Sequence, residues 1–220
     1  MILYVFGAGG GAVELLEETK FFDRTDEILG SKLDYVFIED KPKAQAMEIL
    51  SSDGYIYPIF STKQMVRNVE YPYGTVSAYN PAFKEKIDKL FPELTWVNCI
   101  SANAYVDANV LANSVGLNMR SGAFVGSTVK LGRHVKINYG AKITHDCKIG
   151  DYSFISINAS VCSGTKIGSK CLIGAGAVIL DKGITIGDGA VVAAGSVVTK
   201  DVAAGKTVMG VPAKEVVSRD

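Results

Sequence analysis

The chain has 220 residues, of which 48% are hydrophobic, and its 23 Lys and Arg balance its 23 Asp and Glu. This length suits one large domain or two modest ones, with an ample apolar core. The absence of a basic excess argues against a nucleic-acid partner. No apolar run approaches the ~18 residues of a membrane span and no basic segment precedes the apolar start, so we expect a cytoplasmic protein.

A strand, a glycine-rich turn and a helix are expected at the start of the chain. Residues 2–6 form a continuous apolar run, typical of a strand buried on both faces. Gly9, Gly10 and Gly11 follow it and lead into an amphipathic helical pattern, an arrangement that lets backbone N–H groups approach a phosphate. The second predicted strand, 35–38, ends at Glu39 and Asp40, which could hold a ribose or a base. The simpler alternative is that the glycines serve tight packing and the acids solvation.

The first part of the chain is too short for a complete dinucleotide-binding fold, because only about 95 residues precede the repeats described below. A third strand is predicted at 75–78. A helix is predicted over 84–91, with Phe83, Ile87 and Leu90 on one side and Pro92 ending it. We therefore assign residues 1–95 to a short Rossmann-like α/β domain and residues 96–220 to a second domain.

The second domain is dominated by a period of six. An aliphatic residue returns at every sixth position: Val125, Leu131, Ile137, Ile143, Ile149, Ile155, Val161, Ile167, Ile173, Ile179. Four positions after each of the first nine stands a small or β-branched residue: Val129, Val135, Ala141, Cys147, Ser153, Ala159, Thr165, Cys171, Ala177. This is the period of a hexapeptide β-helix, neither the 3.6 of an α-helix nor the 2 of a plain strand. Ten consecutive matches argue against the alternative, an antiparallel sandwich with six-residue strands.

Three hexads make one triangular coil, so two residues 18 positions apart should lie on the same face, about 4.8 Å apart. One step of seven, between Ile179 and Ile186, predicts a bulge or an outward loop at a corner.

Metal and disulfide chemistry are not expected. The cysteines Cys99, Cys147, Cys162 and Cys171 form no C-x-x-C pair and fit no zinc spacing, so we predict reduced, structural thiols. With only two histidines, the chain cannot supply the three zinc ligands of a β-helix carbonic anhydrase.

His145 is the candidate catalytic residue. It lies two residues after an inward aliphatic, hence at an outward-facing turn, and Asp146 beside it could orient the imidazole and raise its basicity. The 18-residue rule places Ser163 one coil above, where the Ser163–Gly164 corner could offer a backbone N–H to a developing oxyanion. The alternative is an exposed histidine on a polar corner. His134 has no evident acidic neighbour, and we expect no catalytic role for it.

Several motifs resemble those of a known family, and the resemblance covers essentially the whole chain. They are Gly7-Ala8-Gly9-Gly10, Glu39-Asp40, Ile137-Asn138-Tyr139-Gly140-Ala141, His145-Asp146-Cys147, Ile173-Gly174-Ala175-Gly176-Ala177 and Gly210-Val211-Pro212-Ala213. They are similar to motifs of the bacterial sugar acyltransferases that join a short nucleotide-sugar-binding domain to a left-handed parallel β-helix. That family includes N-acetyltransferases of nucleotide-linked 4-amino-4,6-dideoxysugars and sialic acid O-acetyltransferases.

The resemblance implies a homotrimer with sites in the clefts between neighbouring β-helices, where the substrate amine attacks acetyl-CoA directly. His145 would be the base and Asp146 its partner. The Gly9–Gly11 turn would lie near the phosphates, and Glu39 and Asp40 near the nucleotide base. The positions that match the family's CoA contacts are Phe154, Ser163, Ala175 and Ala193.

The chain departs from the family pattern at three places. Phe154 stands where members often carry a second histidine near the thioester, Gly11 where a histidine follows the first glycines, and Ser101-Ala102 where a His-Pro begins the β-helix. None of these departures removes His145.

We therefore expect an acetyl-CoA-dependent N-acetyltransferase that acts on the 4-amino group of a nucleotide-linked 4-amino-4,6-dideoxysugar, for surface polysaccharide (O-antigen) or glycan biosynthesis. The alternatives are O-acetylation of a sugar of the sialic acid type and a non-catalytic nucleotide-sugar-binding trimer. A dehydrogenase is the weakest reading, because no second half-domain is available for nicotinamide. The sequence leaves open the sugar and the choice among UDP, dTDP and GDP.

Overall fold

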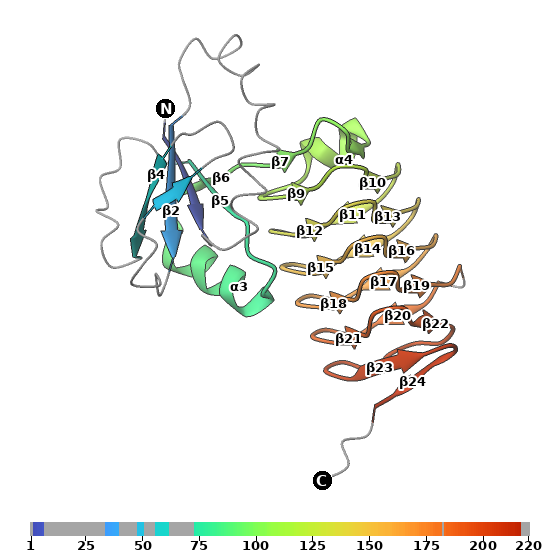
Figure 1. Ribbon diagram of the computed structural model, residues 1–220. Coiled ribbons are helices and arrows are strands. Elements are labelled where there is room, and N and C mark those ends of the chain that lie inside the picture. Colours follow the sequence, from blue (N-terminus) through green and yellow to red (C-terminus); the bar gives the residue numbers. More distant parts are fainter. Residues whose placement is uncertain are drawn as a thin grey trace.

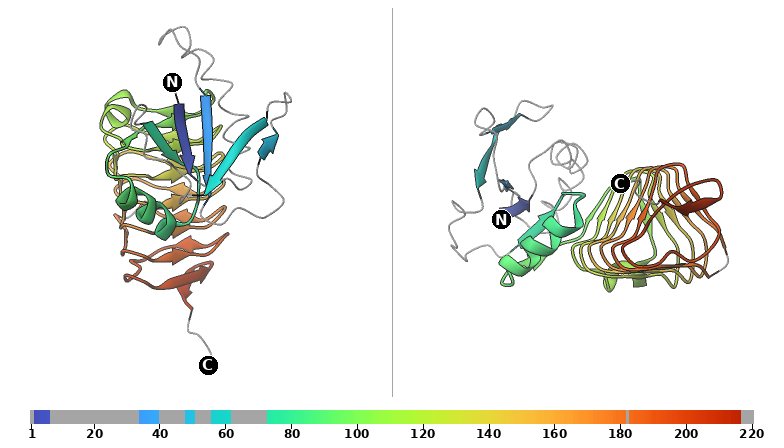
Figure 2. Two further views of the ribbon diagram at one scale, coloured as in Figure 1. Left: turned by 90° about the vertical axis from the view of Figure 1, so that its left-hand side faces the viewer. Right: turned by 90° about the horizontal axis from the view of Figure 1, so that it is seen from below.

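The computed structural model describes residues 2–6, 34–39, 48–50, 56–61, 73–181 and 183–216. A small mixed sheet and one helix lie beside a tall stack of coils (Figures 1 and 2). Within these ranges, neither helix has the length and apolar character that crossing a bilayer requires.

The first sheet has the strand order β3-β4-β2-β1-β5-β6. Its strands are β1 (Ile2–Phe6), β2 (Asp34–Glu39), β3 (Glu48–Leu50), β4 (Ile56–Ser61), β5 (Tyr73–Val76) and β6 (Thr95–Trp96). All pairs are parallel except β3 with β4. The predicted third strand is present but begins and ends two residues earlier than expected.

Helix α3 (Pro81–Leu90) begins three residues before the predicted start. The side chain of Asn80 accepts hydrogen bonds from the N–H groups of Ala82 and Phe83 at 2.9 and 3.2 Å, and Pro81 occupies the first turn, where its missing N–H costs nothing. Of the apolar residues expected on one side of this helix, Ile87 is buried, whereas Leu90 at the end of the helix is 39% exposed. Lys84 is also buried, because the side of the helix that carries it packs against the coils.

The coils form a parallel β-helix with three faces. Face I has the order β24-β23-β21-β18-β15-β12-β9-β7, face II has the order β22-β19-β16-β13-β10-β8, and face III has the order β11-β14-β17-β20. The strands of face I are β7 (Cys99–Ile100), β9 (Asn118–Met119), β12 (Lys136–Ile137), β15 (Phe154–Ile155), β18 (Leu172–Ile173), β21 (Val191–Val192), β23 (Thr207–Gly210) and β24 (Ala213–Glu215). Those of face II are β8 (Tyr105–Val106), β10 (Phe124–Val125), β13 (Lys142–Ile143), β16 (Ser160–Val161), β19 (Val178–Ile179) and β22 (Val197–Val198). Those of face III are β11 (Lys130–Leu131), β14 (Lys148–Ile149), β17 (Lys166–Ile167) and β20 (Thr185–Ile186).

The period of six is confirmed as the packing rule of the β-helix. The repeated aliphatic residues are buried except Leu131, which is half-buried, and the small residues between them are also buried. The short helix α4 (Ala108–Ala112) lies at the first coil and adds Val110 to the same core. Stacked parallel coils with these repeats fit a left-handed β-helix.

The 18-residue rule is confirmed in the central coils, whereas the first coil pairs at an offset of 19, as Tyr105 does with Phe124, and the last at an offset of 16, as Val191 does with Thr207. Val125 pairs with Ile143, Ile143 with Val161, and Val161 with Ile179. Beyond the step of seven, the offset grows to 19, because Lys166 pairs with Thr185. The extra residue is absorbed at the corner that contains Asp181 and Gly183, and Gly183 has a φ of 65°.

Candidate functional site

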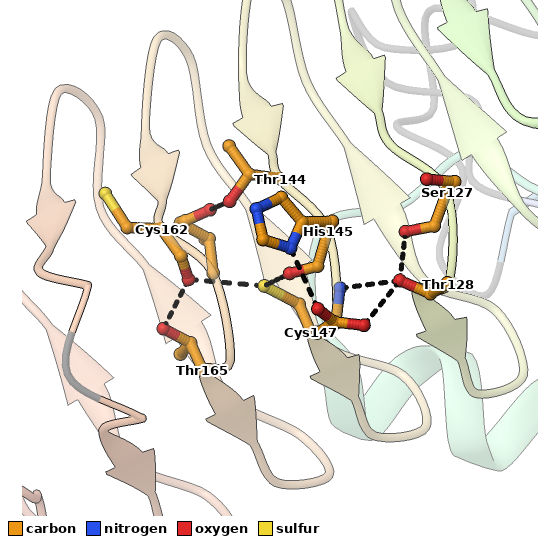
Figure 3. A network of polar contacts seen from close by, with 9 residues as sticks. Ser127, Thr128, Thr144, His145, Cys147, Cys162 and Thr165 are labelled. Atoms are coloured by element: carbon orange, nitrogen blue, oxygen red, sulfur yellow. Dashed lines mark hydrogen bonds and ion pairs between the residues drawn. The ribbon is translucent and has the colours of Figure 1, made fainter.

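His145 and Asp146 lie at the corner where the chain passes from β13 on face II to β14 on face III (Figure 3). Their side chains are 62% and 64% exposed, as the sequence predicts for an outward corner. Nδ1 of His145 is 2.9 Å from Oδ2 of Asp146. This pairing leaves Nε2 of the imidazole available to accept a proton from a bound group.

A third residue, one coil earlier in the chain, completes the arrangement. Oγ1 of Thr128 lies 2.7 Å from Oδ1 of Asp146 and accepts the backbone N–H of Asp146 at 2.9 Å. The hydrogen bond from Thr128, followed by that from His145, lowers the pKa of Asp146, so its carboxylate form is favoured. The sequence reasoning missed Thr128, although the 18-residue rule applied downward from Asp146 leads directly to it.

The Ser163–Gly164 corner stacks on the His145 corner from the next coil, as predicted, but its predicted role as an oxyanion donor needs one correction. The N–H of Gly164 donates to the carbonyl of His145 at 3.3 Å, which confirms that the two corners are stacked. Because that N–H is already used, Gly164 is not an open oxyanion donor in this structure. The neighbouring half-buried Ser163 lies at the same corner, next to the His145 coil.

Cysteine and threonine side chains support the corner from inside. Sγ of Cys147 and Oγ1 of Thr165 donate to the carbonyl of Cys162, at 3.3 and 2.7 Å (Figure 3). Burial raises the pKa of the Cys147 thiol, which keeps it protonated and unreactive. The corner therefore presents an imidazole, not a thiolate, to a ligand.

The other predicted CoA contacts do not join this corner within one chain. Phe154 points outward from β15 on face I, where its ring lies 6.2 Å from that of Tyr79, centroid to centroid. Ala175 and Ala193 lie at the corner between faces I and II. Face I and its corner with face II are both separated from His145 by the width of the β-helix.

The predicted nucleotide contacts lie almost entirely outside the described residues. Gly9, Gly10, Gly11 and Asp40 belong to the ranges that the structure does not describe. Glu39 is the last residue of β2, and β2 is the parallel neighbour of β1 in the sheet.

A second polar cluster joins α3 to the coils, and it includes His134, for which the sequence showed no acidic neighbour. Contrary to the expectation, His134 is buried and has an acidic partner, because its Nε2 lies 3.2 Å from Oδ1 of Asp88. Arg133 donates to the same carboxylate through Nε at 3.1 Å and Nη2 at 2.7 Å, and Oη of Tyr152 donates at 2.7 Å. The His134 ring stacks on Tyr152 and meets the edge of Trp96. The cluster is thus a docking contact between α3 and the corner of faces III and I.

Comparisons with known proteins agree with this architecture. Residues 146–181 match the family model described as bacterial transferase hexapeptide (six repeats), and residues 164–200 match the hexapeptide repeat of succinyl-transferase. A comparison with curated proteins finds no match.

Solved structures match over almost the whole chain. The acetyltransferase domain of PglB from Neisseria gonorrhoeae is 26% identical, with a TM-score of 0.81 over 98% of this chain and 99% of that one. A second structure of that domain, in complex with acetyl coenzyme A, is 25% identical, with a TM-score of 0.78 over 98% of each chain. WeeI from Acinetobacter baumannii is 28% identical, with a TM-score of 0.79 over 98% of this chain and 100% of that one.

A variant of GDP-perosamine N-acetyltransferase from Caulobacter crescentus, in complex with CoA and GDP-perosamine, has the same fold. It is 21% identical, with a TM-score of 0.80 over 99% of this chain and 98% of that one.

Proposed function

We propose that this chain, whose resemblance to the bacterial hexapeptide-repeat sugar acyltransferases is confirmed, acetylates the 4-amino group of a nucleotide-linked 4-amino-4,6-dideoxysugar. The co-substrate is acetyl-CoA, which is bound by the PglB domain that matches this chain over almost its full length. The observation that carries the proposal is the exposed His145–Asp146 pair, with Nδ1 and Oδ2 2.9 Å apart, on a β-helix of this kind.

The geometry of the corner accounts for the chemistry. An amine that attacks the thioester carbonyl must lose a proton as the C–N bond forms and the C–S bond breaks. Nε2 of His145 takes that proton, while Asp146 holds Nδ1 and stabilises the imidazolium that results. Proton transfer by a placed base is worth roughly 10²–10⁴-fold in rate. The amide of Ser163, one coil above, is the candidate donor to the thioester oxygen.

The active unit in this proposal is a homotrimer, and the three faces of the β-helix support it. Face III carries the exposed Lys130, Lys148 and Lys166 on successive strands, and like charges directly opposite one another favour contact with water. The outward positions of the later coils on the other two faces are small or aliphatic: Ser160, Val178 and Val197 on face II, and Leu172 and Val191 on face I. Faces I and II are therefore the surfaces that we place between copies.

This packing completes the site. His145 lies at the corner of faces II and III, whereas face I carries Phe154, and α3 lies at the corner of faces III and I. When face II of one copy meets face I of the next, His145 faces the N-terminal domain and Phe154 of the neighbouring copy. The residues that one chain keeps apart then line one cleft. Sedimentation should give three times the chain mass of 23.4 kDa.

The nucleotide is assigned to the domain of residues 1–95, and the acyl transfer to the β-helix of residues 96–220. The first sheet includes β6 as its last strand in the chain, and the first β-helix strand, β7, begins three residues after β6, which supports this division. Gly9–Gly11, Glu39 and Asp40 stay the proposed contacts of the phosphates and the base.

The test is a comparison of wild type with His145→Gln, which keeps a polar side chain but removes the base. With acetyl-CoA and a nucleotide-linked 4-amino-4,6-dideoxysugar, kcat should fall roughly 10²–10⁴-fold. Acetyl-CoA should still raise the melting temperature of both proteins, because the ligand binds the folded state. Equal rates for the two proteins would exclude His145 as the base. Thermal shifts with UDP, dTDP and GDP, measured in parallel, would choose the carrier, and acetyl transfer only to a sugar hydroxyl would favour O-acetylation.

A further inference from the structure

Thr128, which lies one coil before His145 (Figure 3), holds the carboxylate of Asp146. Its Oγ1 is 2.7 Å from Oδ1 of Asp146 and 2.9 Å from the backbone nitrogen of the same residue. The other carboxylate oxygen, Oδ2, is 2.9 Å from Nδ1 of His145. One hydroxyl therefore contacts both the backbone and the side chain of the residue that orients the imidazole.

This contact replaces a regular feature of the fold. At comparable corners, the N–H of the residue with positive φ donates to a backbone carbonyl of the coil before it, as Gly164 does to His145 and Gly140 does to Ser121. Asp146 has a φ of 61°, yet its N–H donates to the Thr128 hydroxyl instead. At the His145 corner, the Thr128 hydroxyl thus replaces the backbone carbonyl as the acceptor of this hydrogen bond.

The backbone of Thr128 does not favour a threonine. Its φ is 61°, in the left-handed region where a β-branched residue is a genuine outlier. The other described non-glycine residues with positive φ are all unbranched at Cβ: His134, Asp146, Tyr152, Asn158 and Lys170. Glycine, which adopts this conformation without strain, occupies the equivalent corner position at Gly164. In this strained conformation, the threonine supplies the hydroxyl that contacts the backbone and the side chain of Asp146.

We propose that Thr128 is a positioning residue for acetyl transfer: its hydroxyl donates to Oδ1 of Asp146, so that Oδ2 accepts from Nδ1–H of His145 and Nε2 is held as the base. This inference rests on the proposed function of His145. A hydroxyl has one proton, and the carbonyl of Ser127, 2.6 Å away, competes for it. An ionised carboxylate is the stronger acceptor of the two.

The electrostatics agree with the geometry. The hydrogen bond from Thr128 is the first cause of the lowered pKa of Asp146, ahead of the contact with His145. His145 and Asp146 are consecutive and exposed, so their side chains would otherwise rotate freely in water. Fixing one oxygen of the carboxylate selects the imidazole tautomer and orientation that a base requires.

Three substitutions separate this role from a packing role. Thr128→Val keeps the branched shape and the backbone strain but loses the hydroxyl, Thr128→Ser keeps the hydroxyl, and Thr128→Gly loses the hydroxyl while relieving the strain. We expect kcat to fall about ten- to a hundredfold in the valine and glycine variants, the effect of losing one hydrogen bond to a charged group. KM for acetyl-CoA should change little, and Thr128→Ser should retain most of the activity. Thr128→Gly should melt at a temperature no lower than Thr128→Val, so that its loss of rate cannot be a loss of folding.

A second readout does not depend on activity. ¹⁵N NMR of the His145 ring should show the Nδ1–H tautomer in wild type and Thr128→Ser, and a mixture of tautomers in Thr128→Val and Thr128→Gly. The pKa of Asp146, followed by carboxyl ¹³C shifts, should rise in the same two variants. Full kcat in Thr128→Val, unchanged NMR spectra, or an equal loss in Thr128→Ser would each overturn the inference. If wild type proved inactive, the NMR comparison would still decide whether Thr128 holds the pair, whereas His145→Gln decides the proposed function.

Discussion

Asp88→Asn should weaken the docking of α3 on the coils. The Asp88 carboxylate is 9% exposed and accepts two hydrogen bonds from Arg133 and one from Tyr152, with His134 at 3.2 Å. Burial raises the pKa of Asp88, but the contacts of Arg133, Tyr152 and His134 outweigh burial, so that the pKa is lowered overall. The folded state therefore favours the carboxylate, and an amide of the same size removes the charge without leaving a cavity.

The magnitude follows from the number of contacts that survive. A hydrogen bond to a charged group is worth about 1.5–3 kcal/mol. Asparagine keeps one acceptor oxygen, and the Arg133 side chain, 44% exposed, can return to water, so we count one such bond and not three. The expected loss is about 2 kcal/mol, or about 4–8 °C in Tm for a chain of this length.

Differential scanning calorimetry with a matched control measures this loss. Glu85 lies on the same helix and pairs with Lys89 and Lys170 at 2.8 and 2.7 Å. Both lysine side chains are exposed and can return to water, so Glu85→Gln should change Tm much less than Asp88→Asn. Hydrogen exchange should show α3 losing protection in Asp88→Asn while β17 and β18 keep theirs. A Tm equal to wild type for Asp88→Asn, or an equal loss in Glu85→Gln, would show that the Asp88 carboxylate does not hold α3 on the coils.

Two further predictions test the same contact and the coils. Burial lowers the pKa of His134, although Asp88 opposes this effect, so the unfolded chain binds the proton more readily than the folded one. The free energy of unfolding should therefore fall as the pH drops below about 6.5. Urea titrations at successive pH values should show a weaker dependence of this free energy on pH in His134→Gln. A Cβ at Gly150 would lie 2.5 Å from the backbone of Gly168, so Gly150→Ala should lower the free energy of unfolding by about 1–3 kcal/mol through overpacking. At Gly126 the atoms nearest to an added Cβ are 3.4 Å away, so Gly126→Ala should leave stability nearly unchanged. Equal urea midpoints for the two variants would contradict this prediction.

The β-helix could be predicted because its contacts follow from position in the repeat. Each inward residue is buried by neighbours 18 positions away, so the period alone identified Ile143 as core and His145 as exposed. The same rule placed Ser163 above His145. It would have placed Thr128 below Asp146 had it been applied in both directions.

The contacts of α3 could not be predicted in this way, because no period links the helix to the coils. Asp88 and His134 are 46 positions apart and lie on different elements, so the sequence showed His134 without a partner. The use of the Gly164 N–H by the carbonyl of His145 was missed for a related reason. The rule gives which corners are stacked, but not which backbone groups they exchange.

Lys84 shows how the docking of α3 follows from the backbone of the coils. At a corner, carbonyl groups turn away from the ladder, and covering them with a helix removes the water that would otherwise satisfy them. The Nζ of Lys84 donates to two of them, the carbonyls of His134 and Tyr152, at 3.1 and 3.2 Å. It also donates at 3.3 Å to the carbonyl of Ser153, which accepts a ladder hydrogen bond from the N–H of Lys136 as well. Burial, with Lys136 nearby, lowers the pKa of Lys84. Donation to three carbonyls nevertheless requires the protonated amine, because only the ammonium has three N–H donors. An apolar side chain at this position would fill the space but remove the donor to the carbonyls of His134 and Tyr152, which is why a lysine occupies the buried side of an otherwise amphipathic helix.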